Sequence, residues 1–232
     1  MDSNSPEGKV TAVIFDFDGV ICNTEPLHIR SWQILFARRA LDVPIAELEA
    51  GIGITDISLL QSIFAERNIV AEPREWQLQK RSIYLELLEE SVEEFPGAAT
   101  LVKRLHKSRP LAIASSAWRS AIDTAVRKLC ISQYFRVIVS KEDVARHKPD
   151  PEVFLKAASK LGVEPEGCAV IEDSPAGIQA ARAAGMRCIA VTNSFPTARL
   201  SDADLIVSSL EETERIIAFL VGEDARQADH PA

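Results

Sequence analysis

Short apolar runs alternate with helix-length segments along most of this 232-residue chain. Within each run the apolar residues are consecutive and rich in β-branched types, as they are in strands that are buried on both faces. Strands that alternate with helices form parallel sheets with crossover connections. The candidate strands are residues 10–15, 111–114, 137–139, 168–171, 188–191 and 205–207. We therefore predict an α/β fold with a Rossmann-like, doubly wound parallel sheet.

One interval, residues 24–94, does not follow this alternation, because we find only helical patterns in it. One face of its first helical segment carries Ile29, Trp32, Phe36 and Ala40. A connection of about 70 residues is far longer than a normal crossover. We predict that residues 23–94 form an inserted helical cap domain, and that residues 1–22 and 95–232 form the α/β core domain.

Composition and charge narrow the class of protein. Apolar residues make up 47% of the chain, which is enough for a large core and excludes general disorder. Only the polar tail, residues 222–232, is predicted to be disordered. A formal net charge of -8 argues against non-specific nucleic-acid binding, which needs a basic surface.

Other features of the sequence concern the compartment. No apolar run approaches the ~20 residues that a membrane-spanning helix needs, and no apolar leader segment opens the chain. The four cysteines are scattered, unlike a disulfide framework or a zinc site. We expect a cytoplasmic monomer with a small-molecule substrate and with neither nucleic-acid nor membrane partners.

Two aspartates lie where the first predicted strand ends, in the segment Asp16-Phe17-Asp18-Gly19. Side chains at i and i+2 of a strand point the same way, so these carboxylates would be crowded. Crowded carboxylates repel each other unless a cation or a shared proton compensates. They can then take different roles, one as nucleophile and metal ligand, the other as proton carrier. In isolation the triplet also fits a solvated turn.

Ligands of open parallel sheets bind beyond the carboxyl ends of the strands, and three further segments there carry polar groups. Ser115 and Ser116 precede a helix, where hydroxyl and N–H groups can bind an anion. Lys148 could neutralise a phosphoryl group, and Glu172 with Asp173 would bring more carboxylates. Each of these three segments also has a simpler explanation. The serines could cap the helix, Lys148 could be a surface lysine, and the two acids could be favoured by the dipole of the next helix. Several carboxylates around one lysine predict a hard divalent cation, and oxygen ligation suits Mg²⁺.

Four segments, in this order, resemble the motifs of the haloacid dehalogenase-like superfamily: Asp16-x-Asp18-Gly19, Ser115, Lys148-Pro149-Asp150-Pro151 and Glu172-Asp173-Ser174. The segment from Asp16 to His28 is similar to the branch that contains β-phosphoglucomutase and sugar-phosphate phosphatases. The resemblance extends over roughly residues 10–220. It implies a helical cap that closes over the substrate, in agreement with the helical interval.

The resemblance also implies roles for individual residues. Asp16 would be the nucleophile that forms an aspartyl-phosphate, and Asp18 would protonate the leaving oxygen and then activate water. The substrate and phosphate contacts would come from Ser115, Ser116, Arg119, Lys148 and His28. The Mg²⁺ ligands would be Asp16, Asp18 (through its backbone carbonyl) and Asp173, with Glu172 either as a further ligand or as support for the others. Lys148 would be a third catalytic group.

Single residues distinguish the reactions of this superfamily. Hydrolytic dehalogenases lack the second aspartate, which is present here as Asp18. Phosphonate cleavage needs a cap lysine that forms an imine, and the tempting candidate, Lys80, fits a solvated helix lysine better. The cap arginine of the mutase, which grips the distal phosphate, would fall near Asp56, which is an acid. Arg119 instead resembles sugar-phosphate phosphatases.

We therefore predict a Mg²⁺-dependent phosphatase that hydrolyses a small phosphorylated metabolite, a sugar phosphate, through an aspartyl-phosphate. β-Phosphoglucomutase activity is the alternative. A non-catalytic interaction protein that keeps this fold is a third hypothesis, which would predict loss of the acidic and lysine positions. None of these positions is lost.

Overall fold

Six parallel strands form one sheet in the computed structural model, which describes residues 10–51 and 54–222. Their order is β3-β2-β1-β4-β5-β6, so the first strand of the chain lies inside the sheet. The strands are β1 (Ala12–Phe15), β2 (Leu111–Ala114), β3 (Phe135–Val139), β4 (Cys168–Glu172), β5 (Arg187–Val191) and β6 (Leu205–Val207). Each predicted strand overlaps an observed one, and the predicted α/β fold is confirmed.

Position in the sheet explains where the sequence pattern was clearest. β1 pairs with both β2 and β4, and all of its residues are buried, which explains its unbroken apolar run. β3 lies at the edge of the sheet and begins at Phe135, two residues before the predicted start at 137. Arg136 is exposed there. An edge strand can carry such a residue, and the apolar run alone therefore marked only part of it.

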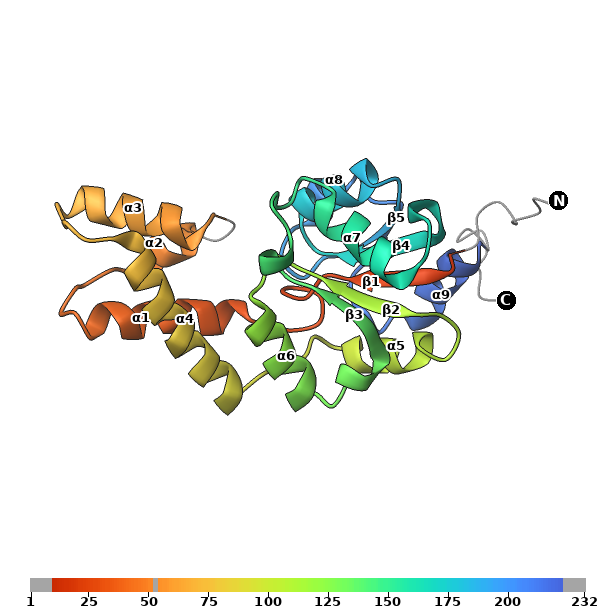
Figure 1. Ribbon diagram of the computed structural model, residues 1–232, viewed down its shortest axis with the longest axis horizontal. Coiled ribbons are helices and arrows are strands. Elements are labelled where there is room, and N and C mark those ends of the chain that lie inside the picture. The colour runs from red at the N-terminus through yellow and green to blue at the C-terminus, as the bar shows by residue number, and fades with distance from the viewer. Residues whose placement is uncertain (1–9, 52–53, 223–232) are drawn as a thin grey trace. The chain divides into compact units, whose positions relative to one another are not determined.

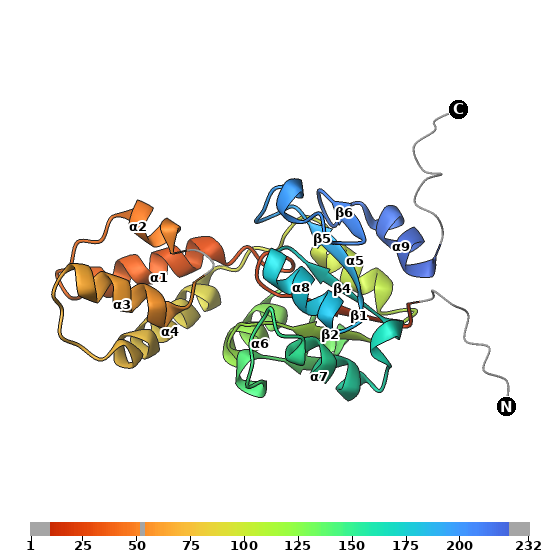
Figure 2. The same cartoon turned by 90° about the horizontal axis from the view of Figure 1, so that it is seen from above.

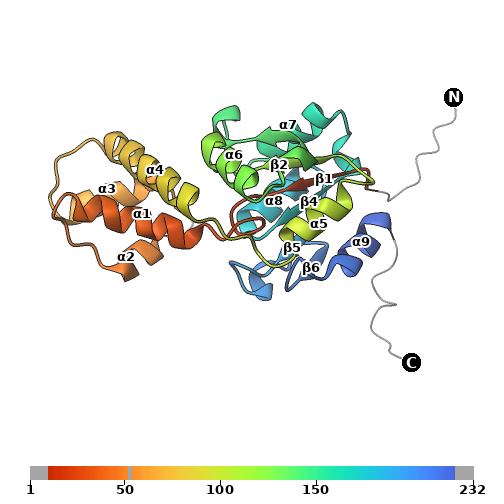
Figure 3. The ribbon, with the colours of Figure 1, turned by 90° about the horizontal axis from the view of Figure 1, so that it is seen from below.

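Helices cover both faces of the sheet, as Figure 1 shows. One face is covered by α7 (Glu152–Leu161) and α8 (Pro175–Ala183). Phe154 and Ile178 of these helices share a buried cluster with Ile14 of β1. The opposite face carries α5 (Ala98–Leu105), α6 (Arg119–Lys128) and α9 (Thr213–Val221) (Figures 1 and 3). The sheet is thus enclosed by helices, and its carboxyl edge carries the loops.

The chain divides into two units, which we call the core domain (Met1–Asn23 and Glu93–Ala232) and the helical domain (Thr24–Val92). The helical domain contains α1 (Glu25–Ala37), α2 (Ile45–Ala50), α3 (Asp56–Glu66) and α4 (Pro73–Glu90) (Figure 2). Its buried cluster is Trp32, Leu35, Phe36, Leu48, Leu59, Leu60, Ile63, Phe64, Trp76 and Ile83. It therefore has a hydrophobic core of its own.

Two predictions for this domain need correction. Ala40 does not continue the apolar face of the first helix, because α1 ends at Ala37 and Ala40 has a positive φ of 53°. The short helix α2 was not predicted, since it buries only Leu48 and gives little periodicity.

The predicted tail, residues 222–232, lies outside the described residues apart from Gly222.

The insertion leaves and re-enters the core domain at neighbouring points. Asn23 N donates a hydrogen bond to the Glu93 carbonyl at 2.9 Å, and Phe95 N donates to the Ile21 carbonyl at 3.0 Å. Cys22 and Glu94 form an antiparallel bridge between these two segments. The two ends of the insertion are therefore paired by backbone hydrogen bonds inside the core domain.

None of the helices in the described part of the chain has both the length and the apolar character needed to cross a membrane.

Candidate active site

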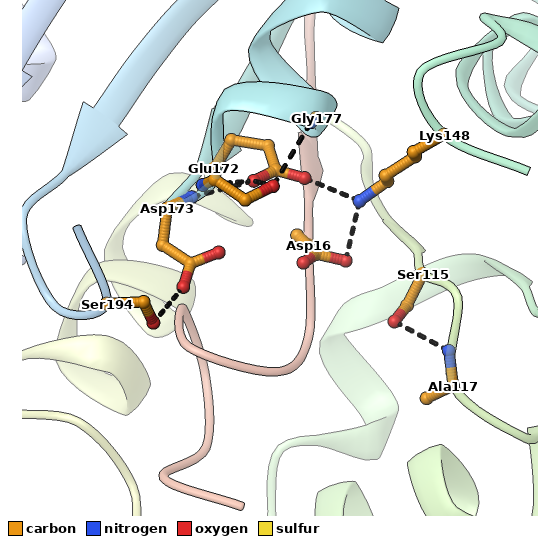
Figure 4. Close-up of polar contacts among 9 residues, drawn as sticks. Asp16, Ser115, Ala117, Lys148, Glu172, Asp173, Gly177 and Ser194 are labelled. Atoms are coloured by element: carbon orange, nitrogen blue, oxygen red, sulfur yellow. Dashed lines mark hydrogen bonds and ion pairs between the residues drawn. The ribbon is translucent and has the colours of Figure 1, made fainter. Parts of the chain in front are cut away.

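The order of the strands brings distant parts of the chain together at the carboxyl edge of the sheet. Asp16 directly follows β1, and its N–H donates to the Ile171 carbonyl of β4 at 2.9 Å. Glu172 is the last residue of β4 and Asp173 the next. Because β1 and β4 are paired in parallel, the side chains that end them lie beside one another (Figure 4).

Three buried carboxylates form a cluster at this edge. Asp16, Glu172 and Asp173 are 7%, 0% and 5% exposed, and each offers an oxygen within 4.8 Å of the others. The Glu172 Oε2 atom accepts from the Asp173 and Ser174 N–H groups, both at 2.8 Å, and from the Ser174 hydroxyl at 3.0 Å. These donors hold Glu172 in the ionised form.

Gly177 in α8 makes room for this carboxylate. A Cβ atom at position 177 would lie 1.7 Å from Glu172 Oε1, which is far inside any allowed contact. Ser174 caps α8, because its hydroxyl accepts from the Gly177 N–H at 3.1 Å. The helix start therefore leaves space for Glu172 where any other residue would place a side chain.

Lys148 joins two of the acids. Its Nζ lies 2.5 Å from Glu172 Oε1 and 2.9 Å from Asp16 Oδ1, and its side chain is 8% exposed. Burial alone would lower the pKa of Lys148, but Asp16 and Glu172 outweigh burial and raise it. Lys148 is therefore a fixed ammonium ion between the first and the fourth strand.

The loop that presents Lys148 is held by two acidic side chains. Asp143 accepts from the Ser140 N–H at 2.8 Å and from the Ser140 hydroxyl at 2.9 Å. Glu152 at the start of α7 accepts from the Ala145 and Arg146 N–H groups, at 2.9 and 3.0 Å. The backbone before Lys148 is thus tied to β3 at one end and to α7 at the other.

The three acids can carry more negative charge than the ammonium group of Lys148 compensates. Burial raises the pKa of Asp16 to about 7, against the attraction of Lys148. Burial, with repulsion from Glu172 and Asp16, raises the pKa of Asp173 to about 8. Burial works against ionisation of Glu172 as well, but Lys148 and the N–H donors lower its pKa. Without a further cation, part of this negative charge would be neutralised by protons near neutral pH.

This donor set fits a divalent cation. Its atoms are carboxylate oxygens, which Mg²⁺ prefers, and they converge on one point with an uncompensated negative charge. The Asp18 side chain is not one of the three converging carboxylates. Asp18 is half-buried in a tight turn, where its backbone bridges to Cys22.

The predicted phosphate contacts fall in different surroundings. Ser115 follows β2, is buried, and its hydroxyl accepts from the Ala117 N–H at 3.1 Å (Figure 4). Ser116 is exposed. Arg119 is also exposed, and its Nε donates to Asp123 at 2.9 Å, one turn further along α6. Ser115 therefore lies at the same sheet edge as Asp16, whereas the Arg119 guanidinium pairs along its own helix.

His28 belongs to the helical domain and has partners there. Its Nδ1 lies 2.7 Å from Lys80 Nζ, and its ring stacks on Tyr84 with centroids 4.1 Å apart. Lys80 is 3% exposed and also lies 3.2 Å from Asp56 Oδ1. The interpretation of Lys80 as a solvated helix lysine was therefore wrong, because it lies on the buried face of α4.

Two polar residues after β5, Asn193 and Ser194, were not predicted to belong to the site. The Ser194 hydroxyl donates to Asp173 Oδ2, and Asn193 Nδ2 donates to the Gly19 carbonyl at 2.8 Å. Figure 4 shows Ser194 beside Asp173. The signal was present, because Thr192-Asn193-Ser194 directly follows a predicted strand.

Fold and site together define an α/β enzyme with a Rossmann-like sheet and a helical insertion after its first strand. The chain belongs to the haloacid dehalogenase-like hydrolases, whose family model matches residues 13–191. The resemblance of the four sequence segments to this family is thereby confirmed.

Relatives of known name include phosphatases and a phosphomutase. The chain is 33% identical to fructose-1-phosphate phosphatase YqaB of Escherichia coli over 79% of this chain and 97% of that protein. It is 36% identical to β-phosphoglucomutase of Bacillus subtilis over 93% of this chain and 96% of that protein. It is 38% identical to the chloroplastic protein Suppressor of Quenching 1 of Arabidopsis thaliana over 84% of this chain, but it spans only 19% of that relative.

Solved structures show the same fold. A crystal structure of β-phosphoglucomutase from Clostridium difficile matches with a TM-score of 0.76 at 28% identity, over 91% of this chain and 97% of that one.

Proposed function

We propose that this protein is a Mg²⁺-dependent phosphatase that hydrolyses a small phosphorylated metabolite, with sugar phosphates as the substrate class. The observation that carries the proposal is the pairing of Asp16 with Lys148 at 2.9 Å, beside two further buried acids. An ionised Asp16 can act as a nucleophile only if the neighbouring negative charge is compensated. Lys148 provides part of this compensation.

The proposed reaction has two steps. First, an Asp16 oxygen attacks phosphorus, the phosphorus–ester oxygen bond breaks, and Asp18 gives a proton to the leaving oxygen. Second, Asp18 takes a proton from water, the water oxygen attacks phosphorus, and the Asp16–phosphorus bond breaks to release inorganic phosphate. Lys148 and Ser115 hold the phosphoryl oxygens in both steps.

Asp16, Glu172 and Asp173, with the Asp18 backbone carbonyl, would hold Mg²⁺. When bound, the ion would supply positive charge against the phosphoryl oxygens and reduce the repulsion between the acids. The resemblance to the family assigns these ligands, and the converging oxygens of the three acids support the assignment.

Asp56 favours a phosphatase over a mutase. A mutase of this type needs a cation in the helical domain for the second phosphate, and the corresponding segment carries Asp56 instead. Asp56 lies 3.2 Å from Lys80, so its charge is directed at a lysine of the same domain. The β-phosphoglucomutase relative keeps phosphomutase activity as the second candidate function.

We also take the enzyme to be a cytoplasmic monomer. All four cysteines, which lie within the described residues, are free thiols, as expected in a reducing compartment.

The variant Asp16→Asn tests the nucleophile, since it keeps the shape of the side chain but removes its charge. We expect turnover of p-nitrophenyl phosphate with Mg²⁺ to be abolished while the circular dichroism spectrum stays unchanged. Asp202→Asn is the matched control, because Asp202 is exposed and pairs with Arg182 on the surface. Undiminished turnover in Asp16→Asn would refute the assignment.

A second assay separates the two activities. The enzyme is incubated with β-glucose 1-phosphate and a trace of the 1,6-bisphosphate. Release of inorganic phosphate indicates a phosphatase, and glucose 6-phosphate without free phosphate indicates a mutase. If no member of a broad phosphate-ester panel is hydrolysed in the presence of Mg²⁺, the third hypothesis, a non-catalytic interaction protein, would be supported instead.

A further inference from the structure

The loop after β5, residues 192–194, contacts two parts of the active site at once. The Ser194 hydroxyl donates a hydrogen bond to Oδ2 of Asp173, which directly follows β4. Asn193 donates to the Gly19 carbonyl, in the turn that follows Asp16 and Asp18. β5 is the neighbour of β4 in the sheet, which places this loop next to the acidic cluster. The family resemblance assigned no role to either residue.

Gly19, Asp173 and Ser194 are packed directly against one another. Gly19 has a positive φ of 78°, and a Cβ atom at this position would lie 1.8 Å from Asp173 Oδ2 and 2.8 Å from Ser194 Oγ. The Asp173 carboxylate thus rests on the backbone of Gly19. Because Asp173 is only 5% exposed, little solvent is available to replace the hydrogen bond from Ser194.

The three acids of the cluster are not held in the same way. Glu172 accepts from two N–H groups, a hydroxyl and Lys148, and Asp16 pairs with Lys148. The bond that orients Asp173 comes from Ser194, a neutral donor. A neutral donor fixes the direction of the carboxylate without cancelling its charge, and this leaves the other oxygen available for a cation.

We propose that Ser194 is a positioning residue that orients the Asp173 carboxylate for a divalent cation and thereby sets the Mg²⁺ affinity of the site. The inference rests on the Mg²⁺ dependence in the proposed function. If Ser194 had only a structural role in its loop, its loss would change stability but not the affinity for Mg²⁺. The two cases therefore differ in a measurable quantity.

The test compares Mg²⁺ binding, without substrate, in the wild type and in Ser194→Ala by isothermal titration calorimetry. Loss of an outer partner of a metal ligand weakens metal binding by about 10- to 100-fold, and we expect a value near the lower end. Ser208→Ala is the control, because the Ser208 hydroxyl also donates to a carboxylate, that of Glu212, at 2.8 Å but on the exposed start of α9. We expect its affinity for Mg²⁺ to equal that of the wild type.

A second pair of variants isolates the hydroxyl if Ser194→Ala does not fold. Ser194→Thr and Ser194→Val have the same shape, and only threonine can donate to Asp173. We expect the Ser194→Thr variant to bind Mg²⁺ about tenfold more tightly than the Ser194→Val variant. In activity assays, the Mg²⁺ concentration that gives the half-maximal rate should be higher for Ser194→Val than for Ser194→Thr. The kcat values of the two variants at saturating Mg²⁺ should agree within about twofold.

Equal Mg²⁺ affinity in Ser194→Thr and Ser194→Val, or in Ser194→Ala and the wild type, would overturn the inference. It would leave the proposed function intact, provided that Asp16→Asn is inactive. Absence of Mg²⁺ binding by the wild type would overturn both. Active Asp16→Asn with weakened binding in Ser194→Ala would overturn only the proposed nucleophile.

Discussion

Each domain buries a lysine beside acidic side chains, but in the core domain the acids outnumber it. In the helical domain Lys80 lies beside Asp56 and the ring of His28. In the core domain Lys148 faces Asp16 and Glu172, and Asp173 adds a third acid to the cluster. Lys80 and Asp56 form an ion pair, whereas the acidic cluster of the core domain carries an excess of negative charge over Lys148.

The helical domain satisfies its lysine in several ways. An ammonium ion can only donate, so His28 Nδ1 accepts and we assign the ring proton to Nε2. The Lys80 ammonium also lies 5.1 Å from the ring centroid of Trp32 and 5.5 Å from that of Tyr84. Aromatic faces stabilise a desolvated cation. The cluster therefore contributes to the packing of the helical domain.

The largest expected effect comes from removing the lysine of the core domain. In Lys148→Met two of the acids, Asp16 and Glu172, lose an ammonium partner, and a phosphoryl group would lose part of the positive charge that neutralises it. We expect the kcat for p-nitrophenyl phosphate to fall by about 10²–10³-fold. Lys107→Met, at an exposed lysine, is the control and should keep normal kcat. A fall of less than about threefold would contradict the view that the core lysine serves chemistry.

Removing the lysine of the helical domain should act on stability. Lys80→Met leaves Asp56 without this partner, and breaking a buried pair costs about 3–5 kcal/mol. Because Asp56 is 24% exposed, we expect a smaller loss, of about 2 kcal/mol in the free energy of unfolding, measured with urea. Arg74→Met, at an exposed position of the same helix, should change it by less than about 0.5 kcal/mol.

Adding Asp56→Asn to Lys80→Met should recover part of the lost stability, because it removes the uncompensated acid. If the double variant is less stable than Lys80→Met alone, the two charges are not a balanced pair and the comparison between the domains fails.

The smallest expected effect is a pH dependence of the metal-free protein. The pKa values of Asp16 and Asp173 are raised to about 7 and about 8, above those of the unfolded chain. Between the unfolded and folded values the folded state holds more protons, so its stability falls as pH rises. With a chelator present we expect the free energy of unfolding, measured with urea, to fall as the pH rises from 6 to 8.

Saturating Mg²⁺ should remove this slope, because the cation takes the place of the protons. The variant Asp173→Asn in chelator should have a shallower slope than the wild type, since one of the two groups is absent. A metal-free stability that rises over the same pH range would contradict the assignment of excess negative charge to the core domain.

The sequence was most informative where an apolar run ends in a polar residue. Asp16, Glu172 and Lys148 follow predicted strands, and the parallel order of the strands explains why they meet. Ser194 follows a strand as well, but serine and asparagine after a strand are typical of any loop, and only the contact with Asp173 distinguishes them. Residue type alone could not reveal it.

Lys80 illustrates a different limit of prediction from sequence, which concerns contacts between helices. In α4 the buried residues are Trp76, Lys80, Ile83, Tyr84 and Leu88, which follow a helical period. The lysine therefore lies on the apolar stripe, and its burial was readable from spacing. Its partners were not, because Asp56 and His28 come from other helices of the domain, whose packing one sequence does not fix.

The backbone pairing of Asn23 with Glu93 has a consequence for protein engineering. Backbone hydrogen bonds join the two segments that flank the insertion, and this pairing lies outside the exchanged segment. A chimera could exchange the whole segment Thr24–Val92 for that of a relative while the catalytic half stays native. Under the proposed function, such a chimera tests whether substrate preference follows the helical domain while the chemistry stays with the core domain.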